Sequence, residues 1–157
     1  MNIQKIKSFE VDHTRLLPGM YISRVDGDVT TFDLRTRRPN AGDYMDNATM
    51  HTFEHLFATY IRNSSIGSAV LYFGPMGCQT GFYLLARDLA PQAVYAEVLA
   101  VLKKIIAHEG EVFGASEVEC GNYRNLALPT AKAEAKRYLD ILTVRGETDF
   151  SYEGERA

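Results

Sequence analysis

The chain of 157 residues has few cysteines and no long apolar run, and these absences exclude whole classes of protein. Its two cysteines, Cys78 and Cys120, are too few for a disulfide scaffold in a chain of this size. No stretch approaches the roughly 18 consecutive apolar residues that a membrane-spanning helix needs. The opening sequence MNIQKIKSFEVDH lacks the apolar core of a secretory signal peptide. We therefore expect a cytoplasmic protein with no membrane association.

The chain also lacks an excess of positive charge. Its 17 lysines and arginines are outnumbered by 20 aspartates and glutamates, which gives a net charge of −3 at pH 7. With no basic run either, the sequence does not support a nucleic-acid partner. Hydrophobic residues make up 46% of the chain, enough to bury a core at this length. We expect one domain over residues 1–157.

Alternation of polar and apolar residues predicts several strands. Residues 6–13, IKSFEVDH, are expected to form a short strand, and residues 20–34 a hairpin that turns at DGD, residues 26–28. Two further strands are expected over residues 69–73 and 82–86, on either side of a connection rich in glycine.

Helical periodicity predicts helices over residues 48–62, 91–109 and 129–142. Asn47 is the expected N-cap of the first helix, and a proline opens each of the others. The acidic tail, residues 147–157, is expected to be partly disordered. Because strands and helices alternate irregularly around a tight hairpin, the predicted class is α+β, with a mainly antiparallel sheet packed against helices.

The helix expected over residues 48–62 carries a polar stripe. At about 100° per residue, His51, Glu54 and His55 fall on one side, whereas Phe53 and Phe57 fall on the other. Two histidines four residues apart can direct ring nitrogens at one ion, and a glutamate beside them suits a general base. A solvated helix face is the alternative for a histidine pair alone. The glutamate and the opposed apolar face favour a metal site.

A catalytic metal site needs a third protein ligand and an open position. Downstream, the segment EVECGNY offers Glu117, Glu119 and Cys120. A glutamate would suit a small metallopeptidase of the inverzincin type, whereas a thiolate would suit zinc or iron(II). Cys78, in the small-residue segment PMGCQTG, is expected to face a cleft, where it could act as an acid/base group.

A third interpretation is a non-enzymatic binding module in which zinc is a structural staple. It needs a fourth protein ligand, for which Cys78, His13 and His108 are available. Glu54 and Arg62 share the face of the histidines, which favours a polar cleft over a sealed site. His108 is expected to be solvated near the C-terminal end of its helix.

Five segments together resemble the S-ribosylhomocysteine lyase (autoinducer-2 synthase) family. In chain order they are SFEVDH at 8–13, FDLR at 32–35, HTFEHLFA at 51–58, GPMGCQTGFY at 74–83 and CGNY at 120–123. Their order and spacing, and the length of the chain, agree with the family. One departure is that many members have an acidic residue and a serine shortly before PMGC, where this chain has Tyr72 and Gly74.

The resemblance implies how the site is built. His51, His55 and Cys120 would bind one divalent metal per subunit, with iron(II) as the physiological ion and zinc often present in isolated members. Glu54 and Cys78 would be the two catalytic acid/base groups.

The resemblance also implies substrate, assembly and pathway. Ser8, His13 and Arg35 would bind S-ribosylhomocysteine. The family is homodimeric, with active sites at the subunit interface. The implied reaction yields homocysteine and 4,5-dihydroxy-2,3-pentanedione, the autoinducer-2 precursor, by carbonyl migration and β-elimination. It would serve the activated methyl cycle, in which methionine is recycled, and quorum sensing.

Overall fold

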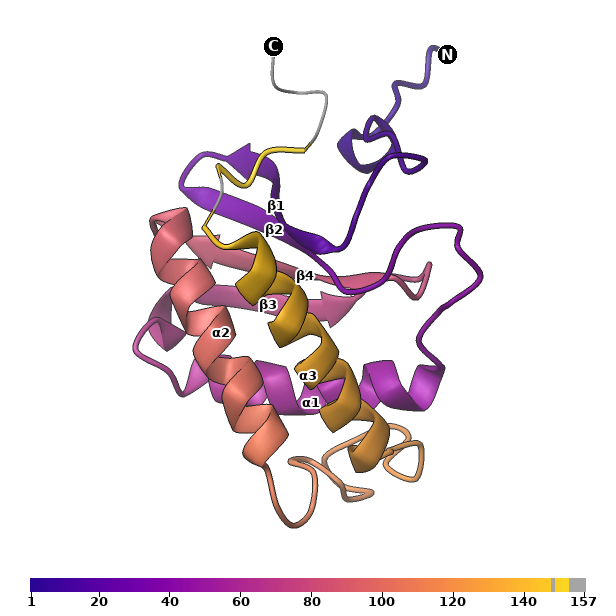
Figure 1. Cartoon of the computed structure of the whole chain (residues 1–157), viewed down its shortest axis with the longest axis vertical. Helices are drawn as coiled ribbons and strands as arrows, with labels where there is room; N and C mark the ends of the chain where they lie inside the picture. The colour runs from indigo at the N-terminus through magenta and orange to yellow at the C-terminus, as the bar shows by residue number, and fades with distance from the viewer. Residues whose placement is uncertain (148, 153–157) are drawn as a thin grey trace.

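The computed structural model describes residues 1–147 and 149–152, and in them four strands form one antiparallel sheet with three helices on one side (Figure 1). The strands lie in the order β1-β2-β4-β3. They are β1 (Gly19–Asp26), β2 (Val29–Arg35), β3 (Val70–Pro75) and β4 (Gly81–Arg87). The helices are α1 (Asn47–Arg62), α2 (Pro91–Ala107) and α3 (Leu128–Arg145). The predicted α+β class is confirmed. None of these helices is long and apolar enough to cross a membrane.

The predicted hairpin is confirmed as β1 and β2. Asp26 pairs with Val29, so the turn consists of Gly27 and Asp28, and Gly27 has a φ of 61°, which glycine adopts without steric cost. The strand expected over residues 6–13 is wrong: Lys7–Phe9 form a short 3-10 helix. The backbone N–H of Thr14 donates to the Asp12 carboxylate, a local turn that competes with strand pairing.

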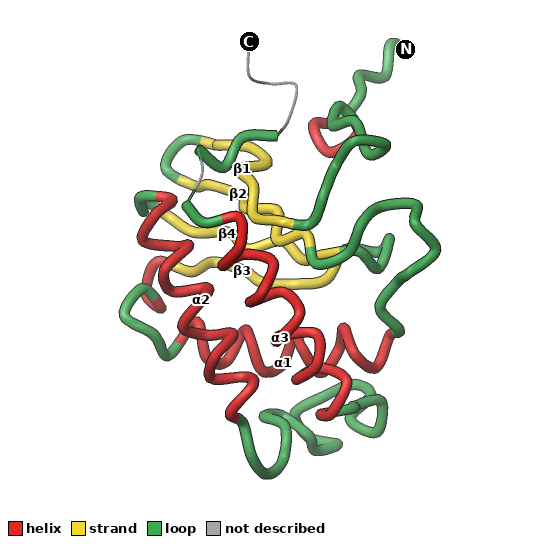
Figure 2. Tube along the Cα trace, viewed as in Figure 1, coloured by secondary structure: helices red, strands yellow, loops and turns green. Residues whose placement is uncertain are grey.

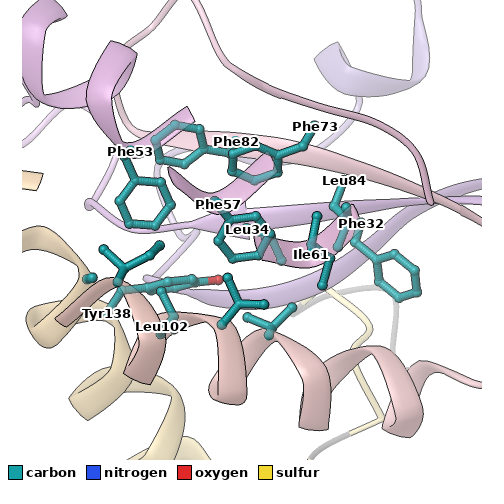
Figure 3. Packing of buried hydrophobic residues seen from close by; sticks show 14 of the residues in the cluster. Phe32, Leu34, Phe53, Phe57, Ile61, Phe73, Phe82, Leu84, Leu102 and Tyr138 are labelled. Carbon is teal, nitrogen blue, oxygen red and sulfur yellow. The ribbon is translucent and has the colours of Figure 1, made fainter. Parts of the chain in front are cut away.

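The apolar face of α1 packs on the sheet through aromatic rings (Figure 3). Phe53 stacks on Phe82 of β4 with ring centroids 4.6 Å apart, and Phe57 stacks on Phe73 of β3 at 4.2 Å. Both α1 phenylalanines are fully buried. Since a helix turns about 100° per residue, this packing directs the stripe of His51 away from the core.

The segment before α1 and the loop between α2 and α3 are long connections outside the helices and strands (Figure 2), and the loop carries Cys120. The cap of α1 is Asp46, whose carboxylate accepts from the backbone N–H of Thr49 at 2.8 Å, rather than Asn47 as predicted. Asn47 lies in the first turn, where its side-chain oxygen accepts from the Asn125 amide of the α2–α3 loop. The start of α1 is therefore tied to that loop.

One further expectation is corrected by tertiary packing. His108 is buried rather than solvated: its Nε2 lies 2.8 Å from the Glu111 carbonyl and its Nδ1 2.7 Å from the Tyr60 hydroxyl of α1. In the tail, Phe150 and Tyr152 are buried, and the Phe150 carbonyl accepts from the backbone N–H of Ile22. Of the tail expected to be partly disordered, residues 148 and 153–157 lie outside the described residues.

Candidate active site

A group of three possible metal ligands lies on the exposed side of α1. His51, His55 and Cys120 place one ligand atom each within 4.8 Å of one another. The Cys120 Sγ lies 3.3 Å from His51 Nε2 and 3.7 Å from His55 Nε2. In a tetrahedral zinc site with ordinary bond lengths, a sulfur and a nitrogen ligand are about 3.5 Å apart. The spacing of these three atoms therefore fits a divalent ion.

The α2–α3 loop orients both imidazoles. His51 Nδ1 lies 2.8 Å from the carbonyl of Asn125, and His55 Nδ1 lies 2.7 Å from the carbonyl of Phe113. A carbonyl only accepts, so each Nδ1 must carry the proton, and each Nε2 is left with a lone pair that faces Cys120. Gly114 has a φ of 71°, and a Cβ there would lie 3.2 Å from His55 Nδ1, so a glycine lets the loop approach.

Glu54 lies between two hollows beside this group. One, of about 280 Å³, is lined by His51, Glu54, Pro75 and residues of the segment 122–125. The other, of about 330 Å³, is lined by Glu54 and His55 together with Tyr72 and Arg62. A half-buried carboxylate that borders both hollows can reach a molecule held next to the metal ligands.

A second polar group surrounds Cys78. The exposed Cys78 Sγ lies 3.0 Å from the Thr80 hydroxyl and 3.8 Å from Nη1 of Arg35. Arg35 is itself buried and donates through Nε and Nη2 to the two carboxylate oxygens of Asp33, at 3.1 and 2.7 Å. Burial opposes the charge on Arg35, but the attraction and hydrogen bonding of Asp33, with smaller contributions from Cys78 and Tyr152, together outweigh it and raise the pKa of the guanidinium. The thiol therefore faces a permanent cation.

Asp33, Thr80 and Tyr83 belong to this group but had no role in the sequence prediction. Asp33 and Arg35 stand two apart on β2, so their side chains share one face of the sheet. The alternation of side chains could have revealed Asp33. Tyr83 lies inside the segment GPMGCQTGFY. Burial chiefly raises the pKa of its phenol, and the charges of Asp33 and Cys78 raise it further. Arg35 and a hydrogen bond with Ser8 lower it.

The remaining predicted substrate residues are placed differently. Through Tyr83, Ser8 joins the group around Cys78. The His13 ring, in contrast, lies 2.9 Å from the carbonyl of Val11 in its own segment. Within the described part of the chain, Cys78 lines neither of the hollows that Glu54 borders. The printed contacts of Cys78 are with Thr80 and Arg35, and among the described residues it does not join the group of possible metal ligands.

The alternative ligands lie elsewhere. In the described residues, neither Glu117 nor Glu119 joins the group of possible metal ligands, and the Glu119 carboxylate accepts from the hydroxyl of Ser116 in its own loop. His108 uses both ring nitrogens in contacts with Tyr60 and Glu111. The structure thus favours Cys120 as third ligand over the peptidase arrangement, and provides no fourth ligand at His108.

Comparisons with known proteins identify the family of this chain. The sequence model of one family, S-ribosylhomocysteinase (LuxS), matches residues 6–148. The S-ribosylhomocysteine lyase of Clostridium beijerinckii is 45% identical over 157 aligned residues, which cover 96% of this chain and 99% of that protein. The lyases of Finegoldia magna and Borreliella burgdorferi are 42% and 40% identical, over 89% and 96% of this chain and 92% and 99% of theirs. The chain belongs to the S-ribosylhomocysteinase family and is a carbon–sulfur lyase.

Proposed function

We propose that this member of the S-ribosylhomocysteinase family cleaves S-ribosylhomocysteine to homocysteine and 4,5-dihydroxy-2,3-pentanedione, and that residues 1–157 act as one lyase domain. The observation that carries the proposal is the group of His51, His55 and Cys120 with Glu54 beside it. It accompanies a thiol, Cys78, held next to a buried guanidinium. Lyases of this name share 40–45% of their residues with the chain over most of its length.

His51, His55 and Cys120 would hold one divalent ion per subunit. Two neutral imidazoles and one thiolate suit zinc or iron(II), and we propose iron(II) as the physiological ion. A divalent ion bound there would supply Lewis-acid polarisation of the substrate carbonyl. The two carbonyl acceptors on the Nδ1 atoms fix the rings, so both nitrogens keep their aim.

Glu54 and Cys78 would move the protons. In each carbonyl migration one proton leaves a carbon and one returns to its neighbour, while a second proton passes between the two oxygens. We assign the carbon protons to Cys78 and the oxygen protons to Glu54. In the elimination a base removes the C4 proton, the C5–sulfur bond breaks with its electron pair on sulfur, and protonation of that sulfur gives homocysteine. The enol that remains tautomerises to the dione.

Because Cys78 and Glu54 belong to separate groups in one chain, we propose that two copies complete each site. The residues around Cys78 in one subunit would face His51, His55 and Cys120 of the other subunit in a homodimer. The N-terminal segment supports this, since Ile3, Ile6 and Phe9 are 87%, 56% and 65% exposed, an unusual placement for large apolar side chains. Ser8 lies beside Phe9 in the sequence and, through Tyr83, belongs to the group of residues around Cys78.

Substrate binding would use Ser8, His13 and Arg35. The Arg35 guanidinium is already oriented by Asp33, and Ser8 is placed near it by Tyr83. His13 lies on the same N-terminal segment as Ser8, so it would reach the substrate once that segment meets a second subunit. We place the enzyme in the cytoplasm, where the activated methyl cycle would take up the homocysteine. The dione would be the precursor of autoinducer-2 in quorum sensing.

The test is release of free thiol from S-ribosylhomocysteine. Protein loaded with iron(II) without oxygen is incubated with substrate, and a thiol reagent follows homocysteine. We expect release that stops on chelation and in the Cys78→Ala and Glu54→Gln variants. Glu109→Gln, an exposed carboxylate beyond α2, serves as the matched control and should keep full activity. Full release by Cys78→Ala would refute the role of that thiol.

A further inference from the structure

The C-terminal tail folds back onto the β1–β2 hairpin. Its last described residues lie beside β1 (Figure 1), where the Phe150 carbonyl accepts from the backbone N–H of Ile22 at 2.7 Å. Two residues on, the Tyr152 side chain is 3% exposed, and its ring stacks on that of Tyr21 with centroids 5.0 Å apart. Tyr152 lies beyond residues 6–148, the part of the chain that the sequence model of the family matches. The tail therefore places in the core a residue to which the family match gives no role.

The hydroxyl of Tyr152 is aimed at Asp33 on β2. It donates to Oδ2 of Asp33 at 2.7 Å, the same oxygen that accepts from Nη2 of Arg35. Burial chiefly raises the pKa of the Tyr152 phenol, and the charge of Asp33 and the hydrogen bond to it raise the pKa further. A hydrogen bond with Ser23 and the charge of Arg35 lower it by less. The phenol therefore keeps its proton and is a permanent donor to the carboxylate.

A chain of hydrogen bonds leads from Tyr152 to the surroundings of Cys78. Asp33 accepts from Tyr152 and also from Nε and Nη2 of Arg35. With these two nitrogens engaged, Arg35 presents Nη1 to the Thr80 hydroxyl at 2.8 Å and to Cys78 Sγ at 3.8 Å. Because a guanidinium is planar, the position of the Asp33 carboxylate determines the direction in which Nη1 points. Tyr152 thus helps to fix the cation that faces the thiol.

We propose that Tyr152 is a positioning residue for the lyase reaction, whose hydroxyl fixes the Asp33 carboxylate and so aims Arg35 at Cys78. This inference rests on the proposed function, in which Arg35 binds substrate and Cys78 moves the carbon protons. Without the hydroxyl, the Asp33 carboxylate can rotate and carry the guanidinium with it. Tyr152, 119 residues from Asp33 in the chain, thereby acts through two other side chains rather than on the substrate.

The test uses Tyr152→Phe, which removes the hydroxyl and keeps the ring. The first measurement is the rate at which iodoacetamide alkylates Cys78 in metal-loaded protein without substrate, with the peptides of Cys78 and Cys120 separated by mass spectrometry. A nearby cation favours the reactive thiolate, so a displaced Arg35 should slow alkylation at pH 7 by about 3- to 10-fold. The second measurement is kcat/KM for S-ribosylhomocysteine, which should fall by a similar factor.

Tyr95→Phe is the matched control, because it also removes a buried hydroxyl, one that donates to the Leu142 carbonyl at 3.0 Å. It should leave the alkylation rate and kcat/KM unchanged. In an Arg35→Lys background the effect of Tyr152→Phe on alkylation should disappear, since lysine lacks the planar fork through which the tyrosine acts.

An unchanged alkylation rate in Tyr152→Phe would overturn the inference. The same fold-decrease in the Arg35→Lys background would also overturn it, because an effect of the tyrosine on folding alone does not depend on the guanidinium. Alkylation needs no turnover, so failure of the proposed function is seen separately. A folded, metal-loaded wild type that releases no thiol from S-ribosylhomocysteine would overturn that function, and with it the place of Tyr152 in the reaction.

Discussion

Two ion pairs on the β1–β2 hairpin have the same spacing and opposite environments, which allows a sharp stability prediction. Asp33 and Arg35 on β2 are 1% and 3% exposed, whereas Arg24 and Asp26 on β1 are both 53% exposed. In each pair Nε and Nη2 of the arginine each donate to a different oxygen of the carboxylate. The pairs differ in burial and in their further partners, since Asp33 also accepts from the Tyr152 hydroxyl at 2.7 Å and Arg35 also donates to the Thr80 hydroxyl at 2.8 Å.

Replacing Asp33 by asparagine leaves the Arg35 charge buried without its counter-ion. Removing one partner of a buried pair costs about 3–5 kcal/mol, which for a chain of this size lowers Tm by roughly 6–20 °C. Asp26→Asn, at the exposed pair, should change stability far less, because water already screens that interaction. The double variant Asp33→Leu with Arg35→Met should recover part of the loss, since no charge is left buried but the buried Tyr152 hydroxyl loses its acceptor.

The assay is urea unfolding followed by circular dichroism, with all variants at one protein concentration because dimerisation would contribute to stability. We expect the loss in Asp33→Asn to exceed that in Asp26→Asn by several-fold. Equal losses in the two variants would refute the reasoning from burial. A double variant less stable than Asp33→Asn would refute the assignment of the loss to the unpaired charge.

The remaining predictions concern the helix cap, the metal and the assembly. Asp46→Ala should lower the free energy of unfolding by about 1 kcal/mol, measured by urea unfolding, whereas Asp46→Ser keeps most of it. Hydrogen bonds from the side chain and then the backbone of one threonine hold the pKa of Asp46 below its usual value. The contribution of the cap to the free energy of unfolding should therefore be complete above about pH 4 and disappear as the pH falls through the lowered pKa. A stability difference between wild type and Asp46→Ala that grows in acid would contradict this. After dialysis, elemental analysis should find that His51→Ala and Cys120→Ala have each lost their bound metal, whereas Glu54→Gln retains it. Metal retained by Cys120→Ala would exclude that thiol as a ligand. Refolding a mixture of Cys78→Ala and Glu54→Gln should restore about a quarter of wild-type activity, since half of the dimers are mixed and each has one intact site. No recovery would show that both groups act from one chain.

Local periodicity was enough to predict which side of α1 carries His51, Glu54 and His55. The spacing of His51, Glu54 and His55 against Phe53 and Phe57 is a property of the helix alone, and packing on the sheet confirms it. Strand alternation likewise predicted the hairpin. It failed over residues 6–13, where no described strand pairs with the segment and Asp12 bonds within its own turn.

Contacts between distant segments could not be predicted in this way. The choice of Cys120 over Glu117 depends on how the α2–α3 loop folds against α1, through carbonyls that any residue could supply. The burial of His108 depends on Tyr60, 48 residues earlier in the chain. Only the resemblance to a family chose the thiol in advance, because it carries information about the fold that spacing lacks.

The β-elimination is tested most directly by identifying the five-carbon product. Iron(II)-loaded protein is incubated with S-ribosylhomocysteine without oxygen, a 1,2-diamine is added to trap adjacent carbonyls, and both products are quantified by mass spectrometry. We expect homocysteine and the adduct of 4,5-dihydroxy-2,3-pentanedione in equal amounts. Homocysteine accompanied by free ribose would contradict the proposal, because it would show that the bond to sulfur is hydrolysed rather than eliminated.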